Sequence, residues 1–337
     1  MSQIRFPRPL AFVFSGGLAR SAAQIGMCEV ALELGIKPEI VVGSSTGAIN
    51  AAVFAKDPEN FGPAARDLWG GVAQDKALTS IWRSTLRGLA GGGSTRTQTM
   101  LRKHLHRVFL DMHQSELAIN FVAVATDLSS GHSAAIENSN VVDSLITSAA
   151  FPIIMAPMPD GKDLLIDGSV VAGVPVSQAL AAGAKSIIVF DTGASEVNDD
   201  DVESLGWYEV LALAFTHLIR GQADHDLALA STSVPVVVIS QATGNPFSLR
   251  RAVDAIPEGR RLAAEVLLDL APRQGLPGDQ QAWPLWQLRP WAGLAATMTP
   301  SSVLPSRDPH PRPVRVATDC RSPRGPYWLG LLLESRR

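Results

Sequence analysis

A serine in a glycine-rich turn between an apolar strand and an apolar helix is the feature that most constrains this chain. Residues 40–42 (IVV) form a β-branched run that is typical of a buried strand. They are followed by G-S-S-T-G at positions 43–47 and then by an alanine-rich segment that predicts a helix. Strand, G-x-S-x-G and helix in this order predict a nucleophile elbow, in which Ser45 stands in solvent at a helix N-terminus.

Two glycines belong to this predicted elbow. A side chain at Gly43 or Gly47 would collide with the neighbouring strand or helix, so a sharp turn needs glycine at both positions. The alternative is an ordinary strand-to-helix turn capped by a serine, because the five-residue pattern recurs by chance. The position of the pattern between a strand and a helix favours the elbow.

A second glycine turn precedes the elbow by one strand-helix unit. The apolar run 9–15 predicts a first strand, Gly16 and Gly17 follow, and a helix is expected from 22 to 34. The backbone N–H groups of such a turn can face an anion, and an acyl hydrolase needs an oxyanion hole beside its nucleophile. An ordinary tight turn is the alternative. A dinucleotide site is disfavoured because the G-x-G-x-x-G spacing is absent.

A carboxylate follows a later apolar strand. Residues 164–166 (LLI) predict a short strand that delivers Asp167, and Gly168 comes next. An aspartate in this position is a turn former or a placed carboxylate, and the residues alone favour the turn. We expect this strand to belong to the same parallel sheet as the elbow strand, so Asp167 and Ser45 should converge at the carboxyl edge of that sheet.

The remaining pattern alternates apolar strands with helices. Strands are predicted at 118–128, 185–190 and 234–239, with a hairpin partner at 133–136. Helices are predicted at 64–69 (ended by Gly70-Gly71), 99–108, 141–150, 175–182, 205–230 and 249–270, the last kinked or split at Pro257. Because the strands are apolar on both faces, we expect an α/β, three-layer fold with a mostly parallel central sheet covered by helices on both faces.

Three segments fit this scheme less directly. Residues 76–94 predict a mobile insertion that serves as a lid or a surface loop. The basic residues of helix 99–108, His104 and His106 among them, are expected on a solvated face, with a phosphate-contacting patch as the alternative. His104 and His106 are two residues apart, so they would not share a side as metal ligands do. Prolines recur from Pro272 onward, so residues 1–271 are expected to form the domain and residues 272–337 a poorly ordered Pro/Arg/Trp-rich tail.

Composition excludes several classes of function. The 337 residues are 46% apolar with a net charge of −3, so nothing indicates a nucleic-acid partner. Cys28 and Cys320 lie far apart, which argues against a disulfide framework or a cysteine metal site. No apolar run reaches the roughly 20 residues of a membrane span. The short apolar run after Arg8 favours a core strand over a signal peptide, so we expect a cytoplasmic protein that can act peripherally at a membrane.

Taken together, these motifs resemble those of the patatin-like phospholipase family. The resemblance extends from about residue 10 to residue 270 and is carried mainly by Ser15-Gly16-Gly17, the G-x-S-x-G elbow and Asp167-Gly168. Four further segments are similar to the family: QIG at 24–26, ATDL at 125–128, SAAFP at 148–152 and VPV at 174–176.

The resemblance implies an activity and a set of site residues. Members of the family are acyl hydrolases that cleave fatty-acyl esters of phospholipids and other lipids through a Ser–Asp dyad and an acyl-enzyme, without metal or cofactor. It implies Ser45 as nucleophile and Asp167 as base. It further implies oxyanion N–H groups from Gly16, Gly17 and Leu18, with Arg20, Gly43, Gly47 and Gly168 in support. The expected partner is a lipid substrate at a membrane or micelle surface.

Two residues depart from the family pattern, and two other functions stay open. Leu18 and Ser21 stand where the family usually has glycine. If position 18 needs a positive φ, Leu18 costs strain on the order of 1–3 kcal/mol. The alternatives are a Ser-His-Asp α/β-hydrolase that uses His217 or His225, and a catalytically weak patatin-like lipid-binding or interaction module.

Overall fold

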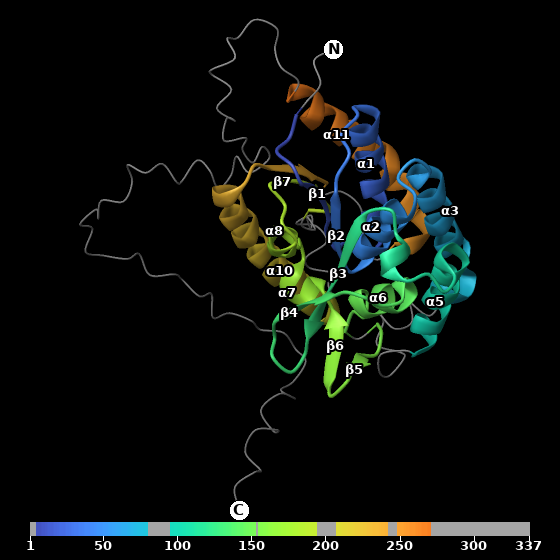
Figure 1. Cartoon of the computed structure of the whole chain (residues 1–337). Helices are drawn as coiled ribbons and strands as arrows, with labels where there is room; N and C mark the ends of the chain where they lie inside the picture. Colours follow the sequence, from blue (N-terminus) through green and yellow to red (C-terminus); the bar gives the residue numbers. More distant parts are fainter. Residues whose placement is uncertain (1–4, 80–94, 153, 194–206, 242–247, 271–337) are drawn as a thin grey trace, which may run out of the picture. The chain divides into compact units, whose positions relative to one another are not determined.

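The computed structural model describes residues 5–79, 95–152, 154–193, 207–241 and 248–270, with side chains from residue 214 onward in the fourth segment. The strands of this part are β1 (Leu10–Phe14), β2 (Ile40–Ser44), β3 (Asn120–Asp127), β4 (Ser133–Ile136), β5 (Met158–Asp160), β6 (Asp163–Asp167), β7 (Ser186–Asp191) and β8 (Val236–Ser240). They form one eight-stranded sheet of order β5-β6-β3-β2-β1-β7-β8, with β4 also paired to β3 (Figure 1).

Helices cover both faces of this sheet (Figure 1). One face carries α1 (Ala23–Glu33), α2 (Thr46–Lys56), α3 (Phe61–Gln74), α5 (Thr95–Phe109), α6 (Val141–Ser148) and α11 (Ile256–Asp269). The other face carries α7 (Ser169–Ala172), α8 (Val176–Ala181) and α10 (Trp207–Ser233). Short 3₁₀ helices lie at η1 (Leu18–Ala22), η2 (Gln114–Glu116) and η3 (Leu249–Ala255). The expected α/β fold with helices on both sides is confirmed.

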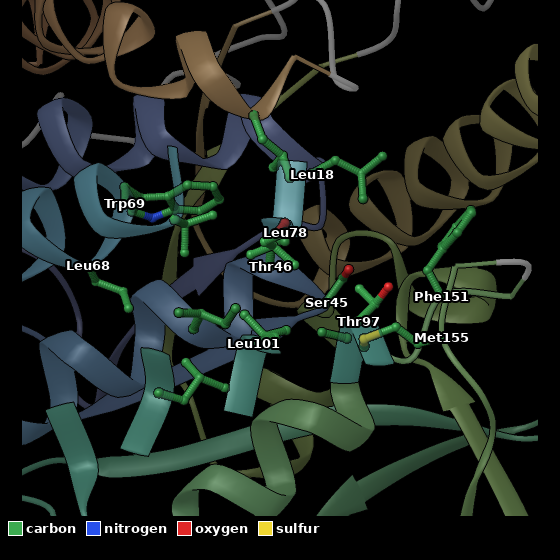
Figure 2. Close-up of a pocket in the computed structure, with 15 residues that line it drawn as sticks. Leu18, Ser45, Thr46, Leu68, Trp69, Leu78, Thr97, Leu101, Phe151 and Met155 are labelled. Atoms are coloured by element: carbon green, nitrogen blue, oxygen red, sulfur yellow. The ribbon is translucent and has the colours of Figure 1, made fainter. Parts of the chain in front are cut away.

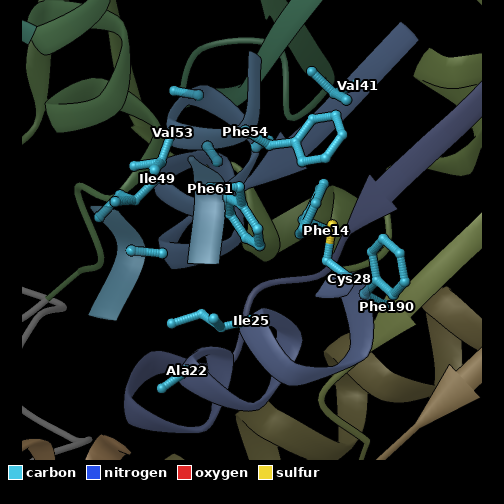
Figure 3. Packing of buried hydrophobic residues seen from close by; sticks show 14 of the residues in the cluster. Phe14, Ala22, Ile25, Cys28, Val41, Ile49, Val53, Phe54, Phe61 and Phe190 are labelled. Atoms are coloured by element: carbon cyan, nitrogen blue, oxygen red, sulfur yellow. The ribbon is translucent and has the colours of Figure 1, made fainter. Parts of the chain in front are cut away.

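The sheet has a separate apolar core on each of its two faces, because its parallel strands are buried on both sides. Strands β3, β2, β1, β7 and β8 are parallel neighbours in that order. Side chains alternate between the faces of a strand, so Phe12 and Phe14 of β1 enter one core while Ala11 and Val13 enter the other. Phe190 of β7 packs against both phenylalanines, with ring centroids 5.0 Å apart in each pair. Figure 3 shows Phe190 beside Phe14.

The strand that delivers Asp167 does not run parallel, and here the sequence prediction was wrong. β6 pairs antiparallel with both β3 and β5. The reason is a tight hairpin between β5 and β6, in which Gly161 has a φ of +61°. The two-residue loop Gly161-Lys162 joins the paired residues Asp160 and Asp163 and reverses the chain, and the glycine in its first position was the sequence signal for it.

Helix α3 corrects a second prediction. The expected stop at Gly70-Gly71 is absent, and the helix continues to Gln74. Glycine costs about 1 kcal/mol in a helix interior, but burial of Trp69 and Val72 against the core outweighs that cost. A side chain at Gly71 would lie 3.4 Å from the ring of His104.

Histidine 104 corrects a third prediction, which placed it on a solvated face of the basic helix. It is 5% exposed, and its Nε2 lies 3.0 Å from Oδ2 of Asp75. His106 on the same helix is exposed, so the two rings do not share a side, as expected.

Other elements follow the predicted pattern. β4 is the antiparallel hairpin partner of β3. The last helical segment is split into η3 and α11, and α11 begins at Ile256 with Pro257 in its first turn. Of the predicted insertion, residues 80–94 lie outside the described residues, as does the tail at 272–337. Within the described residues, no helix combines the length and apolar character that a membrane crossing requires.

Candidate active site

Ser45 stands in a strained turn between β2 and α2. Its φ of +55° and ψ of −132° place a non-glycine residue in a sparsely populated region of the backbone map. A Cβ at Gly43 would lie 2.4 Å from Cα of Ala48, and one at Gly47 would lie 2.3 Å from the carbonyl oxygen of Ser15. Glycine is therefore required on both sides of the serine.

The side chain of Ser45 does not project into open solvent, contrary to the sequence prediction. It is 2% exposed and forms part of the wall of a cavity (Figure 2). Its backbone N–H donates to Oγ of Ser148 at 3.0 Å, and that hydroxyl donates to the carbonyl of Val124 at 2.6 Å. The end of α6 thus holds the elbow against β3.

Ser45 and Asp167 meet across β3. The register pairs Ser44 with Val124 on one strand and Asp167 with Ala125 on another, so both residues approach the same end of β3. Oγ of Ser45 donates to Oδ2 of Asp167 at 2.6 Å, and Asp167 is fully buried. The two residues nominated from the sequence are therefore in direct contact.

Several contacts that the sequence did not indicate fix the position of Asp167. Its Oδ1 accepts from the backbone N–H of Ser169 at 2.7 Å and from the Ser169 hydroxyl at 2.6 Å. Thr126 donates through its hydroxyl to the Asp167 carbonyl at 2.9 Å. Only glycine fits at position 168, since a Cβ there would lie 2.1 Å from the carbonyl oxygen of Val124.

Burial raises the pKa of Asp167 from its ordinary value of 3.8 to about 6. Desolvation is the largest cause, because a carboxylate loses its hydration in the protein interior. Hydrogen bonds from Ser169 and Ser45 act in the opposite direction. A carboxyl with a raised pKa beside a serine hydroxyl is suited to accept a proton near neutral pH.

The glycine loop after β1 lies beside this pair. A Cβ at Gly16 would be 3.0 Å from Cβ of Ser169 and 3.1 Å from Cβ of Ser45. The N–H of Gly16 donates to the carbonyl of Gly173 at 3.0 Å, so it is occupied. The N–H groups of Gly17 and Leu18 have no acceptor among the described residues. Of the three nominated oxyanion donors, these two are available.

The backbone of Leu18 is strained, as its place in the glycine loop suggested. Its φ is +55°, in the left-handed region that favours glycine. Strain at Leu18 was expected if its φ is positive, and its φ is positive. Its side chain lines the same cavity as Ser45 (Figure 2).

Residues at the end of β7 support the glycine loop from the side. Thr192 donates through its hydroxyl to the carbonyl of Gly16 at 2.7 Å, and its N–H donates to Oγ of Ser15 at 2.9 Å. Arg20 is 4% exposed and donates to the carbonyl of Gly193 at 3.2 Å. Burial lowers the pKa of Arg20, and the neighbouring charge of Asp191 partly offsets this effect.

An apolar cavity extends from Ser45 between α2, α3 and α5 (Figure 2). It contains about 650 Å³ of space free of protein atoms, part of it open to solvent. Its wall is formed mainly by large apolar side chains: Leu18, Ile49, Trp69, Leu101, Phe151 and Met155. Apolar walls of this kind suit a hydrocarbon chain, with an ester group held at the hydroxyl of Ser45.

The histidines named for a Ser-His-Asp site lie elsewhere. His217 and His225 are both exposed on α10. Within the described residues neither ring has a hydrogen bond to Ser45 or Asp167, and His225 instead lies 3.8 Å from Asp226. The same part of the chain contains no group of three or more His, Cys, Asp or Glu side chains arranged to hold a metal ion.

The fold and site define an α/β protein whose elbow serine contacts a buried aspartate. Residues 12–180 match the family model described as patatin-like phospholipase. This match covers half of the chain, and the chain belongs to the patatin-like phospholipase family.

Curated relatives carry the same domain within much longer chains. The patatin-like phospholipase domain-containing protein 6 of Mus musculus is 27% identical over 192 residues, which is 56% of this chain and 14% of the mouse protein. The neuropathy target esterase sws of Drosophila melanogaster is 28% identical over 208 residues, 59% of this chain and 14% of the fly protein. Lysophospholipase nte1 of Aspergillus terreus is 25% identical over 192 residues, 57% of this chain and 12% of its own length.

Two solved structures are similar at lower sequence identity. VipD from Legionella pneumophila has 12% identity and a TM-score of 0.38, covering 76% of this chain and 66% of its own. The human GIVD cytosolic phospholipase A2 has 13% identity and a TM-score of 0.36, covering 77% of this chain and 58% of its own.

Proposed function

We propose that this protein is a serine acyl hydrolase that cleaves fatty-acyl esters of phospholipids or other lipids, with Ser45 as nucleophile and Asp167 as base. One observation carries the proposal: the 2.6 Å hydrogen bond from Oγ of Ser45 to Oδ2 of Asp167, at the wall of an apolar cavity. Membership of the patatin-like phospholipase family supports the same reaction class.

The first half of the reaction acylates the serine. Asp167 takes the proton of Ser45 as Oγ attacks the ester carbonyl, and a bond forms between Oγ and the carbonyl carbon. The tetrahedral intermediate collapses, the bond to the alcohol breaks, and Asp167 returns the proton to the leaving oxygen. The acyl group then remains on Ser45.

The second half releases the fatty acid. Water donates a proton to Asp167 and attacks the acyl-enzyme, and collapse of the second intermediate returns the proton to Oγ of Ser45. The N–H groups of Gly17 and Leu18 are the proposed donors to the oxyanion in both halves. The N-terminus of α2 adds a favourable field for negative charge at Ser45.

The cavity supports a lipid acyl chain as the group recognised. Its lining residues are mostly apolar, and they include the hydroxyl side chains of Ser45, Thr46 and Thr97. Two of the relatives are named as an esterase and a lysophospholipase, which is compatible with a carboxylic ester of a lipid as substrate.

Two alternatives receive less support. A Ser-His-Asp enzyme needs a histidine at the serine, and His217 and His225 are exposed on α10. A catalytically weak lipid-binding module would be favoured by a misplaced oxyanion loop. The loop carries strain at Leu18, but its N–H groups at Gly17 and Leu18 are unoccupied within the described residues.

The deciding experiment measures hydrolysis of a panel of phospholipids, lysophospholipids and acylglycerols, with mass-spectrometric detection of the released fatty acid. We expect Ser45→Ala to abolish hydrolysis and labelling by a fluorophosphonate probe, because it removes the nucleophile and leaves the fold intact. His217→Ala and His225→Ala are the matched controls and should each retain most activity. A folded histidine variant that has lost several orders of magnitude in rate would favour the Ser-His-Asp enzyme instead.

A further inference from the structure

The two carboxylate oxygens of Asp167 have different partners. Oδ2 faces the nucleophile and accepts from Ser45 at 2.6 Å. Oδ1 accepts two hydrogen bonds from one residue, Ser169, through its backbone N–H at 2.7 Å and its hydroxyl at 2.6 Å. Within the described residues, Ser45 and Ser169 are the side chains that donate to this carboxylate.

Ser169 lies between Asp167 and the glycine loop after β1. It is the first residue of α7, only 8% exposed, and two positions after Asp167. A Cβ added at Gly16 would lie 3.0 Å from the Cβ of Ser169, so Ser169 packs directly against the glycine loop. The serine therefore fills the space between the base and the loop that carries the proposed oxyanion donors.

We propose that Ser169 is a positioning residue for Asp167, whose hydroxyl holds Oδ1 so that Oδ2 faces Ser45. The effect on catalysis rests on the function proposed above, whereas the hydrogen bond itself does not. Within the described residues Ser169 hydrogen-bonds to Asp167 and not to Oγ of Ser45, so it acts through Asp167.

The hydroxyl of Ser169 also affects the pKa of Asp167. A hydrogen bond to the ionised form stabilises that form and lowers the pKa. Side-chain hydrogen bonding from Ser169 is the largest of the effects that oppose the burial of Asp167. Removal of the hydroxyl leaves only the backbone N–H bond to Oδ1, so the carboxyl group loses one of the two hydrogen bonds that orient it and its pKa rises.

The test compares three variants of the full chain. Ser169→Ala removes the hydroxyl, and Ser169→Thr restores one. Ser144→Ala is the matched control, because Ser144 is also buried and its hydroxyl donates to the carbonyl of Val141 in α6 rather than to Asp167.

The readout is the pH dependence of the fluorophosphonate labelling rate. A hydrogen bond to the ionised carboxylate stabilises that form, so we expect Ser169→Ala to move the acidic limb of the pH–rate profile to higher pH by roughly one unit or more. Ser169→Thr should return the limb toward the wild-type position, and Ser144→Ala should leave it unchanged. A uniform loss of rate in Ser169→Ala, with an unmoved limb, would show that Ser169 has only a structural role.

A direct titration separates this proposal from the proposed function. The ¹³C carboxyl signal of Asp167 can be assigned by its loss in Asp167→Asn and followed against pH in the wild type and in Ser169→Ala. A higher midpoint in Ser169→Ala supports the positioning role even if no lipid is hydrolysed. Identical midpoints would overturn it even in an enzyme that is fully active through Ser45.

Discussion

At the scale of single residues, the site depends on a carboxyl group whose burial opposes its ionisation. Asp167 is fully buried, and its pKa is raised from 3.8 to about 6. A group whose pKa is raised by folding stabilises the fold at pH values below its unfolded pKa, and this contribution is lost as the pH rises through the folded pKa. Near pH 8 the ionised carboxylate should therefore reduce the free energy of unfolding.

Asp167→Asn tests the proposed role of Asp167 as base and the effect of its ionisation on stability. It should lose nearly all hydrolysis, because an amide cannot accept the proton of Ser45. At pH 8 it should also be more stable than the wild type, by up to about 3 kcal/mol for a shift of about two pH units. Urea unfolding at pH 8 and pH 4.5 provides the measurement. The difference should fall to about 1 kcal/mol at the lower pH, which still lies above the unfolded pKa of 3.8. A variant less stable than the wild type at pH 8 would contradict the argument.

Leu18 gives a second prediction at the scale of residues. Its φ of +55° costs about 1–2 kcal/mol for a residue with a Cβ. Leu18→Gly relieves this strain and keeps the backbone N–H, so kcat on a short soluble ester should rise or stay the same. KM for a long-chain lipid should increase, because the side chain lines the cavity.

Leu18→Val provides the contrast for this measurement, since a β-branched residue is more strained at positive φ and should lower kcat. A tenfold lower kcat in a stable Leu18→Gly variant would show that leucine is needed in the catalytic step.

Sequence reasoning at this scale found the residues that carry a local signal. Ser45 and Asp167 each follow an apolar strand and are flanked by glycine, which made both recognisable. Ser148 was recognised only as part of the SAAFP segment at 148–152, and Ser169 and Thr192 carry no pattern that indicates their roles. The hydroxyls of Ser148 and Thr192 are placed by contacts with residues far away in the sequence. The exception is the spacing of Ser169 from Asp167, which permits a local side-chain bond after Asp-Gly.

At the scale of elements, hydrophobic periodicity predicted the parallel strands and most helices. The errors arose where local signals and tertiary packing disagree. Helix α3 continues through two glycines because its apolar side is buried, and β6 is reversed by a two-residue hairpin loop. The direction of β6 matters for the site, because Asp167 reaches Ser45 at the end of an antiparallel strand rather than beside it on a parallel one.

At the scale of the whole molecule, the proline-rich composition after Pro272 predicts that the last part of the chain is dispensable for chemistry. The described residues contain a large apolar core. Its buried apolar side chains lie between Phe6 and Leu267. Truncation after Leu270 should therefore leave hydrolysis of a short soluble ester nearly unchanged. Assays on that ester and on phospholipid vesicles separate effects on chemistry from effects at a lipid surface. A truncated chain that fails to fold would show that residues after 270 pack on the domain.

The buried carboxyl of Asp167 has a consequence for how such a protein changes over generations. If its ionised form destabilises the fold at neutral pH, selection for thermal resistance alone will favour neutral replacements at this position. Selection for turnover will oppose them, because the same charge is the proposed base. Screens of random libraries for heat tolerance would then be enriched in inactive variants at residue 167.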